Sequence, residues 1–257
     1  MKEYFDFKGQ VALVTGCSGG LGVQMAKALA SQGCNIVPIA RRMEKLEEVA
    51  AELRAAYGVE VLPIKCDITS TEQVEATVKQ ALAHFGRIDV VINNAGTGAV
   101  APAEDITDAQ FEGEMQIDLF GTFRVARAAA KYAMIPAGYG RVINIASIYG
   151  LVGNTAIPTI AYHSTKGAVV NFTRGAAAEL AKDGITVNAI CPGYFYTELT
   201  TDTLNTEYFQ NFAKQSVPMA RYGNGGELNS AAVFLGAEES SYVTGQIIAV
   251  DGGYTCV

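Results

Sequence analysis

Tyr162 and Lys166 are the side chains of this sequence best suited to proton transfer. On a helix, their i, i+4 spacing puts the phenol and the ammonium on one face. A free phenol has a pKa of about 10 and is a poor base near neutral pH unless a nearby cation favours the phenolate. Lys166 can supply that charge. The pair follows the segment 143–147 and precedes an apolar helical pattern, a placement that argues against an accidental surface pair.

A glycine-rich turn over 15–22, T-G-C-S-G-G-L-G, follows an apolar run and opens a helical pattern. At such a turn, backbone N–H groups and the helix dipole can hold a diphosphate, and glycines let the backbone come close to it. A plain tight turn is the alternative. If the turn binds a dinucleotide, we expect contacts from Gly16, Ser18, Gly20, Leu21 and Gly22.

Two arginines, Arg41 and Arg42, follow the second predicted strand, where dinucleotide folds normally place an acidic residue that binds the ribose hydroxyls. A guanidinium recognises phosphate through its charge and its forked donors. The sequence therefore predicts a preference for NADP over NAD, although NAD is possible, and both arginines could instead be solvated surface charges.

The elements that must position these residues alternate between short β-branched runs and longer helical patterns. The predicted strands are 11–14, 36–39, 59–64, 88–92, 142–145, 185–189 and 247–250. This alternation predicts an α/β fold, a doubly wound Rossmann-type parallel sheet of about seven strands with helices on both faces. Pro38 conflicts with an internal strand because it removes one ladder hydrogen bond.

Composition limits the function classes. The net charge of −7 and the lack of a basic block disfavour nucleic acid as a partner. Five scattered cysteines without C-x-x-C spacing indicate neither a metal site nor a disulfide framework. With no apolar stretch long enough for a signal or a membrane span, we expect a cytoplasmic protein without membrane contact. No linker divides residues 1–257, which we expect to form one domain; the irregular stretch 193–226 is either a substrate lid or a surface excursion.

Taken in order, these motifs resemble the short-chain dehydrogenase/reductase family, with N-N-A-G over 93–96, N-A-I-C-P-G over 188–193 and Y-x-x-x-K over 162–166. The resemblance spans 11–253 and implies an oxidoreductase that moves a hydride between NADP(H) and a small-molecule alcohol or ketone. In the family pattern, further cofactor contacts fall on Asp67, Ile68, Asn94, Ala95, Gly96, Tyr162, Lys166, Pro192, Gly193, Phe195 and Thr197.

The resemblance also assigns the catalytic roles. Ser147 would hold the substrate oxygen, Tyr162 would exchange a proton, and Lys166 would support it. Ser147 precedes Tyr162 by fifteen positions, two more than is usual, and Tyr149 stands at the usual interval. Asp118 occupies the place of the family's usual Asn and would add a charge to the proton relay.

The substrate is less well defined. The stretch 147–154 resembles gluconate 5-dehydrogenases, which implies a polyol or sugar acid such as gluconate or 5-ketogluconate. A hydroxysteroid (bile acid) dehydrogenase with an aromatic lid is the alternative, and a non-catalytic NADP-binding regulator is a hypothesis from another class. We also expect a homodimer or homotetramer. The small and apolar residues that predict a contact between helices are Ala126, Ala128, Ala129, Ala130, Ala168, Val169, Phe172, Ala176 and Leu180.

Overall fold

Seven parallel strands form one sheet in the computed structural model, which describes residues 4–197 and 200–257. The strands are β1 (Val11–Thr15), β2 (Asn35–Ala40), β3 (Ile64–Lys65), β4 (Val90–Asn93), β5 (Gly140–Ile145), β6 (Ile185–Pro192) and β7 (Ile247–Val250). Their order is β3-β2-β1-β4-β5-β6-β7. The strand order reverses between β1 and β4: β1 to β3 extend toward one edge of the sheet, and β4 to β7 extend toward the other. Open α/β sheets bind ligands at the carboxyl ends of the strands beside such a reversal.

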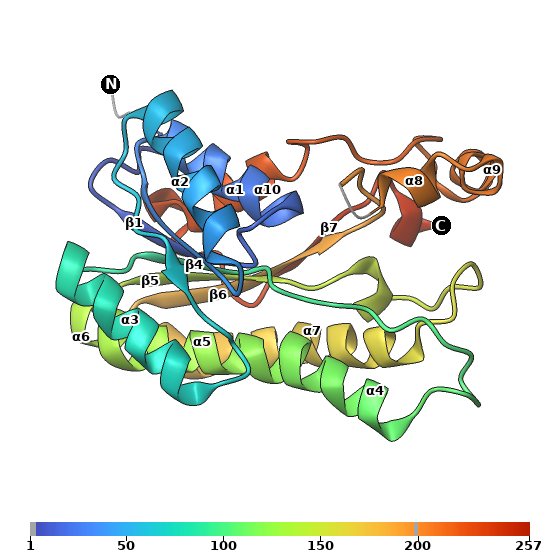
Figure 1. Ribbon diagram of the computed structural model, residues 1–257, viewed down its shortest axis with the longest axis horizontal. Coiled ribbons are helices and arrows are strands. Elements are labelled where there is room, and N and C mark those ends of the chain that lie inside the picture. Colours follow the sequence, from blue (N-terminus) through green and yellow to red (C-terminus); the bar gives the residue numbers. More distant parts are fainter. Residues whose placement is uncertain (1–3, 198–199) are drawn as a thin grey trace.

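Helices cover both faces of the sheet, as the sequence predicts (Figure 1). One face carries α1 (Gly20–Ser31), α2 (Met43–Tyr57) and α10 (Asn229–Gly236), and the other carries α3 (Thr71–Phe85), α5 (Thr122–Ala129) and α7 (Ile160–Leu180). Each layer buries an apolar stripe against strands whose residues are almost all buried. The doubly wound fold class is therefore confirmed, and its two cores lie one on each side of the sheet.

Pro38 lies where its missing N–H does least harm. The predicted strand 59–64 is regular only as the two residues of β3, which lies at the edge of the sheet. The N–H of Ile36 donates to the carbonyl of Glu60 at 3.0 Å, and the two-residue period of a strand turns Pro38 to the same side. Pro38 thus faces the irregular stretch before β3, where a proline costs no regular ladder bond.

A continuous helical rod runs from residue 108 to residue 137. Within it, α4 (Asp108–Glu114), α5 and α6 (Ile135–Ala137) alternate with π-helical turns at Met115–Gly121 and Ala130–Met134. π-Helical turns are rare and are frequent at functional sites. The first of them contains Asp118, which the sequence places in the catalytic group.

The alanines assigned to a subunit contact are instead buried in the core of the chain itself. The side chains at 126 and 128–130 are at most 5% exposed, because they let the helical rod approach the sheet closely. Val169 is also buried, whereas Phe172 packs partly against the same core. The large apolar side chains that this rod exposes are Phe120, Phe123 and Ile135, at 41%, 38% and 43%. An association of copies through this layer would therefore use these larger side chains, and it stays a prediction.

The stretch 193–226 leaves the sheet after β6 and carries α8 (Thr201–Leu204) and α9 (Glu207–Ser216). These helices stand apart from both helical layers (Figure 1). They hold a small apolar cluster of their own, built around Leu204, Phe209 and Tyr222. A lid over a bound ligand needs such a self-contained unit, so the lid assignment remains our hypothesis for this stretch.

Candidate active site

α7 brings Tyr162 and Lys166 to the carboxyl end of β5. The Lys166 side chain is buried, and its Nζ donates to the carbonyl of Ile145 at 3.1 Å. The same Nζ lies 5.3 Å from the centre of the Tyr162 ring. A Cβ at Gly150 would come within 2.6 Å of the Lys166 carbonyl oxygen, so glycine lets the turn after β5 pack on α7. The predicted pair thus shares one face of α7, with Lys166 buried and Tyr162 half-buried.

Ser147 supplies the hydroxyl beside the phenol. Its hydroxyl is close enough to lower the pKa of the Tyr162 phenol, and its Oγ accepts the N–H of Tyr149 at 3.1 Å. Tyr149, the residue at the usual family interval, points elsewhere: its hydroxyl pairs with that of Tyr194 at 2.6 Å. The longer spacing therefore still delivers Ser147 to Tyr162, as the sequence analysis assigns.

His163 and Asn154 organise the longer connection between β5 and α7. The His163 ring stacks on Tyr149 at 4.4 Å, and its Nδ1 lies 2.7 Å from the carbonyl oxygen of Thr159. The side chain of Asn154 is 3.1 Å from His163 Nε2. These contacts orient the Tyr149 ring, which meets Tyr162 edge-on at 6.1 Å. His163 thus contacts Tyr162 only indirectly, through the Tyr149 ring.

Burial and charge set the protonation of Tyr162 and Lys166. Burial raises the pKa of the Tyr162 phenol, and the neighbouring Lys166 charge and the Ser147 hydroxyl offset this only in part. Burial lowers the pKa of Lys166, but Tyr162 and Asp118 outweigh it and the net shift is upward. At neutral pH the pair is therefore a phenol beside an ammonium. This is the state that can donate a proton to a carbonyl oxygen.

Asp118 forms a buried ion pair with Lys166. Its Oδ2 lies 3.0 Å from Lys166 Nζ, and the Asp118 side chain has no exposed surface. Its Oδ1 accepts the N–H of Thr97 at 2.8 Å. A Cβ at Gly96 would lie 3.1 Å from Asp118 Oδ2 and 3.3 Å from Lys166 Nζ, so this glycine makes room for the pair. The carboxylate therefore acts on Lys166 through its charge.

The sequence analysis did not single out Glu114, which lies one helical turn before Asp118. Its side chain is 2% exposed, and its Oε2 accepts the N–H of Ala99 at 2.9 Å. Its Oε1 is buried without a hydrogen-bond partner among the described residues. A glutamate within a polar helical stretch gives no signal by itself, but its i, i+4 spacing to Asp118 could have pointed to it.

The glycine-rich turn packs against the segment after β4. Thr15 Oγ1 accepts the N–H groups of Asn94 and Ala95, each at 2.8 Å. Gly16 has a φ of +63°, and a Cβ there would come within 2.8 Å of the Ala95 Cα. A Cβ at Gly22 would lie 2.5 Å from the Asn94 amide nitrogen. The two predicted cofactor segments, far apart in sequence, thus form one surface.

The N-terminus of α1 fits a diphosphate. Its N-cap residue is Gly19, and no side chain caps it, so its first N–H groups need another acceptor. Arg42 Nη2 donates to Ser18 Oγ at 3.2 Å, and these two residues line a cavity of about 360 Å³ together with Gly20 and Thr197. Arg42 therefore lies beside the turn that would hold the dinucleotide.

Arg41 and Asp67 follow the neighbouring strands β2 and β3. The Thr69 N–H and hydroxyl lower the pKa of the Asp67 carboxyl, and the charge of Arg41 lowers it further. Ile68 is buried, and a Cβ at Gly121 would lie 2.4 Å from its Cδ1. The Ile68 side chain is thus committed to the core beside the helical rod.

The remaining predicted contacts lie near the ends of β6 and β7. Pro192 ends β6, and Gly193 donates its N–H to the carbonyl of Val250 at 2.9 Å. The Phe195 side chain is 6% exposed and packs on Gly223, so only its backbone remains for a ligand. The Thr197 hydroxyl lies 2.9 Å from that of Thr200.

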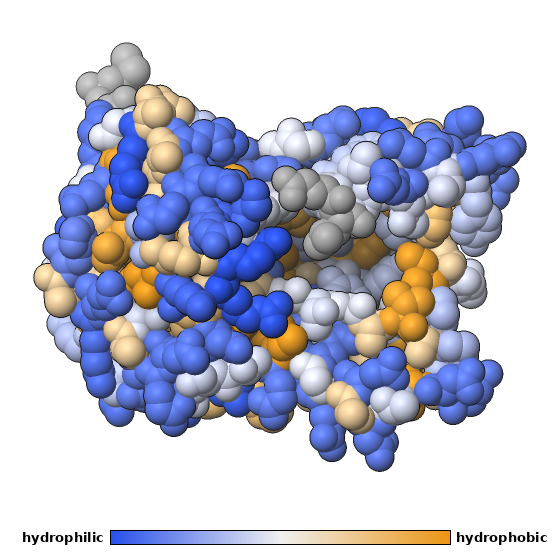
Figure 2. All heavy atoms as spheres, in the orientation of Figure 1, coloured by the Kyte–Doolittle hydropathy of each residue, from blue (hydrophilic) through white to orange (hydrophobic). Residues whose placement is uncertain are grey.

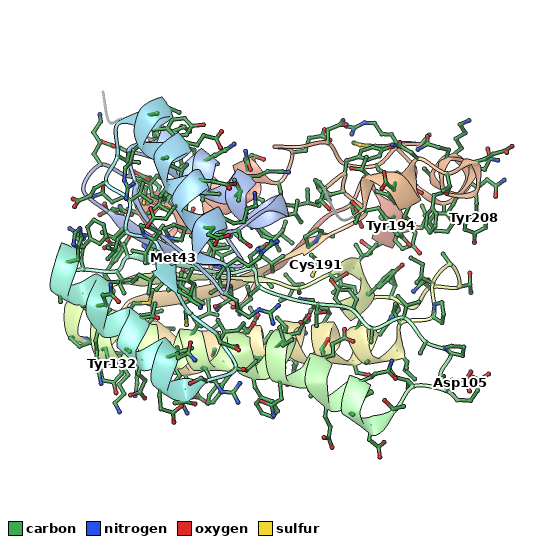
Figure 3. All side chains as sticks on the ribbon, in the orientation of Figure 1. Met43, Asp105, Tyr132, Cys191, Tyr194 and Tyr208 are labelled. Carbon is green, nitrogen blue, oxygen red and sulfur yellow. The ribbon has the colours of Figure 1, made fainter. Side chains whose placement is uncertain are left out.

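An aromatic wall closes the far side of the site. The face in Figure 2 is hollowed between the α1–α2 layer and the α8–α9 segment. Figure 3 shows Tyr194 beyond Cys191, close to α8. Four rings surround that of Tyr194 with centroids 5.5–6.1 Å away, namely Tyr149, Phe212, Tyr222 and Tyr254. Tyr149 and Tyr222 are buried, so the half-buried rings of Tyr194, Phe212 and Tyr254 are the accessible part of this wall.

The basic residues Lys214 and Arg221 of the stretch 193–226 do not favour an anionic substrate. Arg221 forms a two-pronged ion pair with Glu227, both N–H···O distances being 2.7 Å, and this raises the pKa of Arg221. Lys214 is exposed on α9. The Arg221 charge is thus already matched.

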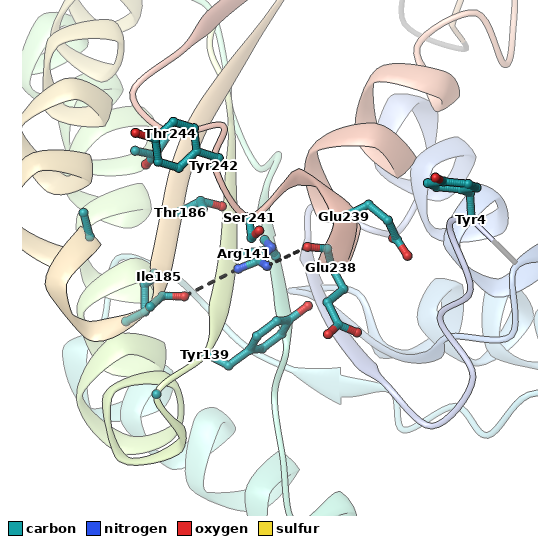
Figure 4. Close-up of a pocket in the computed structure, with 13 residues that line it drawn as sticks. Tyr4, Tyr139, Arg141, Ile185, Thr186, Glu238, Glu239, Ser241, Tyr242 and Thr244 are labelled. Atoms are coloured by element: carbon teal, nitrogen blue, oxygen red, sulfur yellow. Dashed lines mark hydrogen bonds between the residues drawn. The ribbon is translucent and has the colours of Figure 1, made fainter. Parts of the chain in front are cut away.

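A larger cavity, of about 880 Å³, lies at the other end of the sheet. It opens beside the amino ends of β5 and β6 and is lined by Tyr139, Arg141 and Thr186 (Figure 4). The buried Arg141 donates Nε–H to the carbonyl of Ala237 at 3.1 Å. None of the predicted site residues lines this cavity, and its arginine is occupied in holding backbone carbonyls, so we do not assign the chemistry to it.

The described part of the chain, 4–197 and 200–257, contains no helix long and apolar enough to cross a membrane. Within the same ranges, no cluster of His, Cys, Asp or Glu side chains has the arrangement of a metal site.

Comparisons with known proteins find relatives over almost the whole chain. Residues 16–255 match a family model described as enoyl-(acyl carrier protein) reductase. The chain is 37% identical over 253 residues to gluconate 5-dehydrogenase of Gluconobacter oxydans, covering 98% of this chain and 97% of that protein. It is 35% identical to 3-oxoacyl-(acyl-carrier-protein) reductase of Staphylococcus aureus, covering 94% and 96%.

A solved structure shares the fold over almost its full length. It is a gluconate 5-dehydrogenase from Burkholderia cenocepacia in complex with NADP and tartrate, with a TM-score of 0.93 and 35% identity, covering 99% of this chain and 98% of that one. Family members use nicotinamide cofactors and act on CH–OH groups. With this match and the geometry of Ser147, Tyr162 and Lys166, the chain belongs to the short-chain dehydrogenase/reductase family of oxidoreductases.

Proposed function

We propose that the protein is an NADP(H)-dependent oxidoreductase that interconverts a secondary alcohol and a ketone of a polyol or sugar acid, of the gluconate/5-ketogluconate type. The observation that carries the reaction is the grouping of the half-buried Tyr162 with the buried Ser147 and Lys166 at the carboxyl end of β5. The substrate class is supported by the gluconate 5-dehydrogenases among the relatives.

The residues present fit a dinucleotide. The uncapped start of α1 and the close approach of Gly16 and Gly22 to the segment after β4 leave backbone donors for a diphosphate. Arg42, held on Ser18, and Arg41 at the neighbouring strand end would face the adenosine ribose, where a 2′-phosphate needs cations. When bound, the dinucleotide would supply or accept the hydride at its nicotinamide ring.

The chain's own residues would handle the oxygen and its proton. Ser147 would donate a hydrogen bond to the carbonyl oxygen, and Tyr162 would protonate that oxygen as the carbon is reduced. Lys166 stabilises the phenolate that remains, because its ammonium lies beside the Tyr162 ring. In the oxidising direction the same phenolate would accept the alcohol proton.

The aromatic wall favours a second candidate, a hydroxysteroid (bile acid) dehydrogenase. Rings around Tyr194 suit a flat apolar substrate, and the pairing of Arg221 with Glu227 leaves that cation unsuited to a substrate carboxylate. A neutral polyol would meet the same wall through the hydroxyls of Tyr149 and Tyr194.

One screen separates the candidates. Purified protein is assayed by NADPH absorbance with polyols and their ketoses, with gluconate and 5-ketogluconate, and with hydroxysteroids. Saturable turnover with a polyol or sugar acid supports the proposal, whereas turnover confined to steroids replaces it with the second candidate. A strong preference for NAD(H) would contradict the assignment of Arg41 and Arg42.

A further inference from the structure

Two buried carboxyl groups lie on successive turns of the helical rod beside one buried ammonium. Asp118 and Glu114 are 0% and 2% exposed, and Lys166 is 4% exposed. Asp118 pairs with Lys166 at 3.0 Å, whereas Glu114 has no cationic partner in contact within the described ranges. One ammonium cannot neutralise two carboxylates, and a buried unpaired charge takes up a proton where it can.

Both carboxyl groups hold the same loop. The N–H of Thr97 binds Asp118, and the N–H of Ala99 binds Glu114 through Oε2. These bonds use one oxygen of each group and direct both groups to the segment that follows the N-N-A-G motif. Glu114 Oε1 stays buried without a hydrogen-bond partner among the described residues, a place where a proton can reside.

We propose that Glu114 stores a proton for Tyr162, being protonated in the resting protein and exchanging that proton through Asp118 and Lys166 during turnover. The inference rests on the proposed function only for its role in turnover. Glu114 touches no reacting atom, so its effect passes through the residues between it and the phenol.

The proton balance closes without another group. In reduction, the substrate carbon takes a hydride from the reduced dinucleotide, and the substrate oxygen takes the proton of the Tyr162 hydroxyl. The phenolate regains a proton from the Lys166 ammonium, and the amine regains one from the pair of Asp118 and Glu114. Both carboxyl groups are then ionised until solvent returns one proton, and oxidation runs in reverse.

The electrostatics agree with the geometry. Burial raises the pKa of the Glu114 carboxyl, the Ala99 N–H lowers it, and the negative charge of Asp118 raises it. The titratable groups that act on Glu114 are Asp118 on its own rod and Lys166 and Tyr162 on α7. The Lys166 ammonium is already paired with Asp118, so the net shift of the Glu114 pKa is upward and favours the protonated carboxyl.

The storage step is tested in the cofactor-free protein by infrared spectroscopy. A protonated carboxyl absorbs apart from a carboxylate, and exposed carboxyl groups lose their protons near pH 4. We expect a protonated-carboxyl band that persists above about pH 6, shifts when glutamate carboxyls carry ¹³C, and disappears in Glu114→Gln. Glu114 is the buried glutamate among the described residues, so the isotope shift identifies it even if the variant fails to fold.

The matched control is Glu112→Gln, which removes an exposed carboxylate from the same helix and should leave the band unchanged. Glu114→Gln can still accept the Ala99 N–H, so a fall in reductive kcat of about tenfold with a changed pH profile would reflect the proton rather than the loop. Absence of the band above pH 6 in the unmodified protein, its survival in Glu114→Gln, or an unchanged pH profile in that variant would overturn the proposal. The infrared result does not depend on the substrate, so it stands apart from a failure of the proposed function.

Discussion

Replacing Asp118 by Asn removes one charge from a buried ion pair while keeping the volume of the side chain. Asp118 Oδ2 is 3.0 Å from Lys166 Nζ, and neither side chain is more than 5% exposed. The Asn carbonyl oxygen can still accept the Thr97 N–H, so only the charge and one acceptor are lost. Removing one partner of a buried pair costs about 3–5 kcal/mol, because the other charge remains buried and unpaired.

We expect the lower end of this range, because Glu114 can give up its proton and partly replace the lost charge. At about 2–4 °C per kcal/mol for a chain of this size, a cost of about 3 kcal/mol lowers Tm by roughly 6–12 °C. Turnover should fall by more than about tenfold, since Lys166 loses the carboxylate that orients its ammonium.

The assay is thermal unfolding near neutral pH, followed by steady-state kinetics below the transition. Asp105→Asn serves as the control, because Asp105 is exposed in the loop before α4 (Figure 3). A change in Tm below about 2 °C together with nearly full activity would show that Asp118 only accepts a hydrogen bond, and the charge argument would then be wrong.

Four further predictions follow from the same geometry. Tyr162→Phe should bind cofactor as before but lose turnover by about 100-fold or more in the NADPH assay, because the proton donor is gone. Near-normal turnover would exclude Tyr162 as the proton donor. Replacing Arg41 and Arg42 by alanine should raise KM for NADP(H) far more than for NAD(H). Equal changes in the two KM values would show that both arginines are only surface charges. Phe123→Glu should weaken a homo-oligomer in light scattering over a dilution series, and a wild-type monomer at micromolar concentration would refute that contact. Glu114→Gln should gain Tm relative to wild type as pH rises above about 4.3. The raised pKa of the Glu114 carboxyl makes the folded wild type lose stability as pH rises from the unfolded to the folded pKa, whereas glutamine does not titrate. A difference in Tm that does not change with pH would contradict the raised pKa of Glu114.

Much of the fold is encoded in short stretches of sequence. β-Branched runs between amphipathic patterns predicted the parallel sheet, and six of the seven predicted strands lie within about three residues of the observed ones at each end. Gly16 needs its positive φ of +63°, and Tyr162 and Lys166 share a helix face through their spacing. Such features depend on near neighbours, so local patterns were enough to find them.

The predictions that failed or remained open involve partners distant in the sequence. The predicted strand 59–64 lost most of its length because β3 is an edge strand. The alanines at 126 and 128–130 are buried against the chain's own sheet and not exposed for a second copy. Which of the two surfaces covers them depends on how the helical rod packs in three dimensions. Periodicity gives a face but does not say what covers it.

By itself, the sequence determined the sheet, the glycine-rich turn and the shared helix face of Tyr162 and Lys166, because each follows from the spacing of residues along the chain. Only the tertiary structure showed that the Tyr149 hydroxyl pairs with that of Tyr194, and that Asp118 is an ion-pair partner of Lys166. Only the fold also brought Glu114 to this site. Charge effects depend on distance and burial in three dimensions, and neither can be read from the order of residues along the chain.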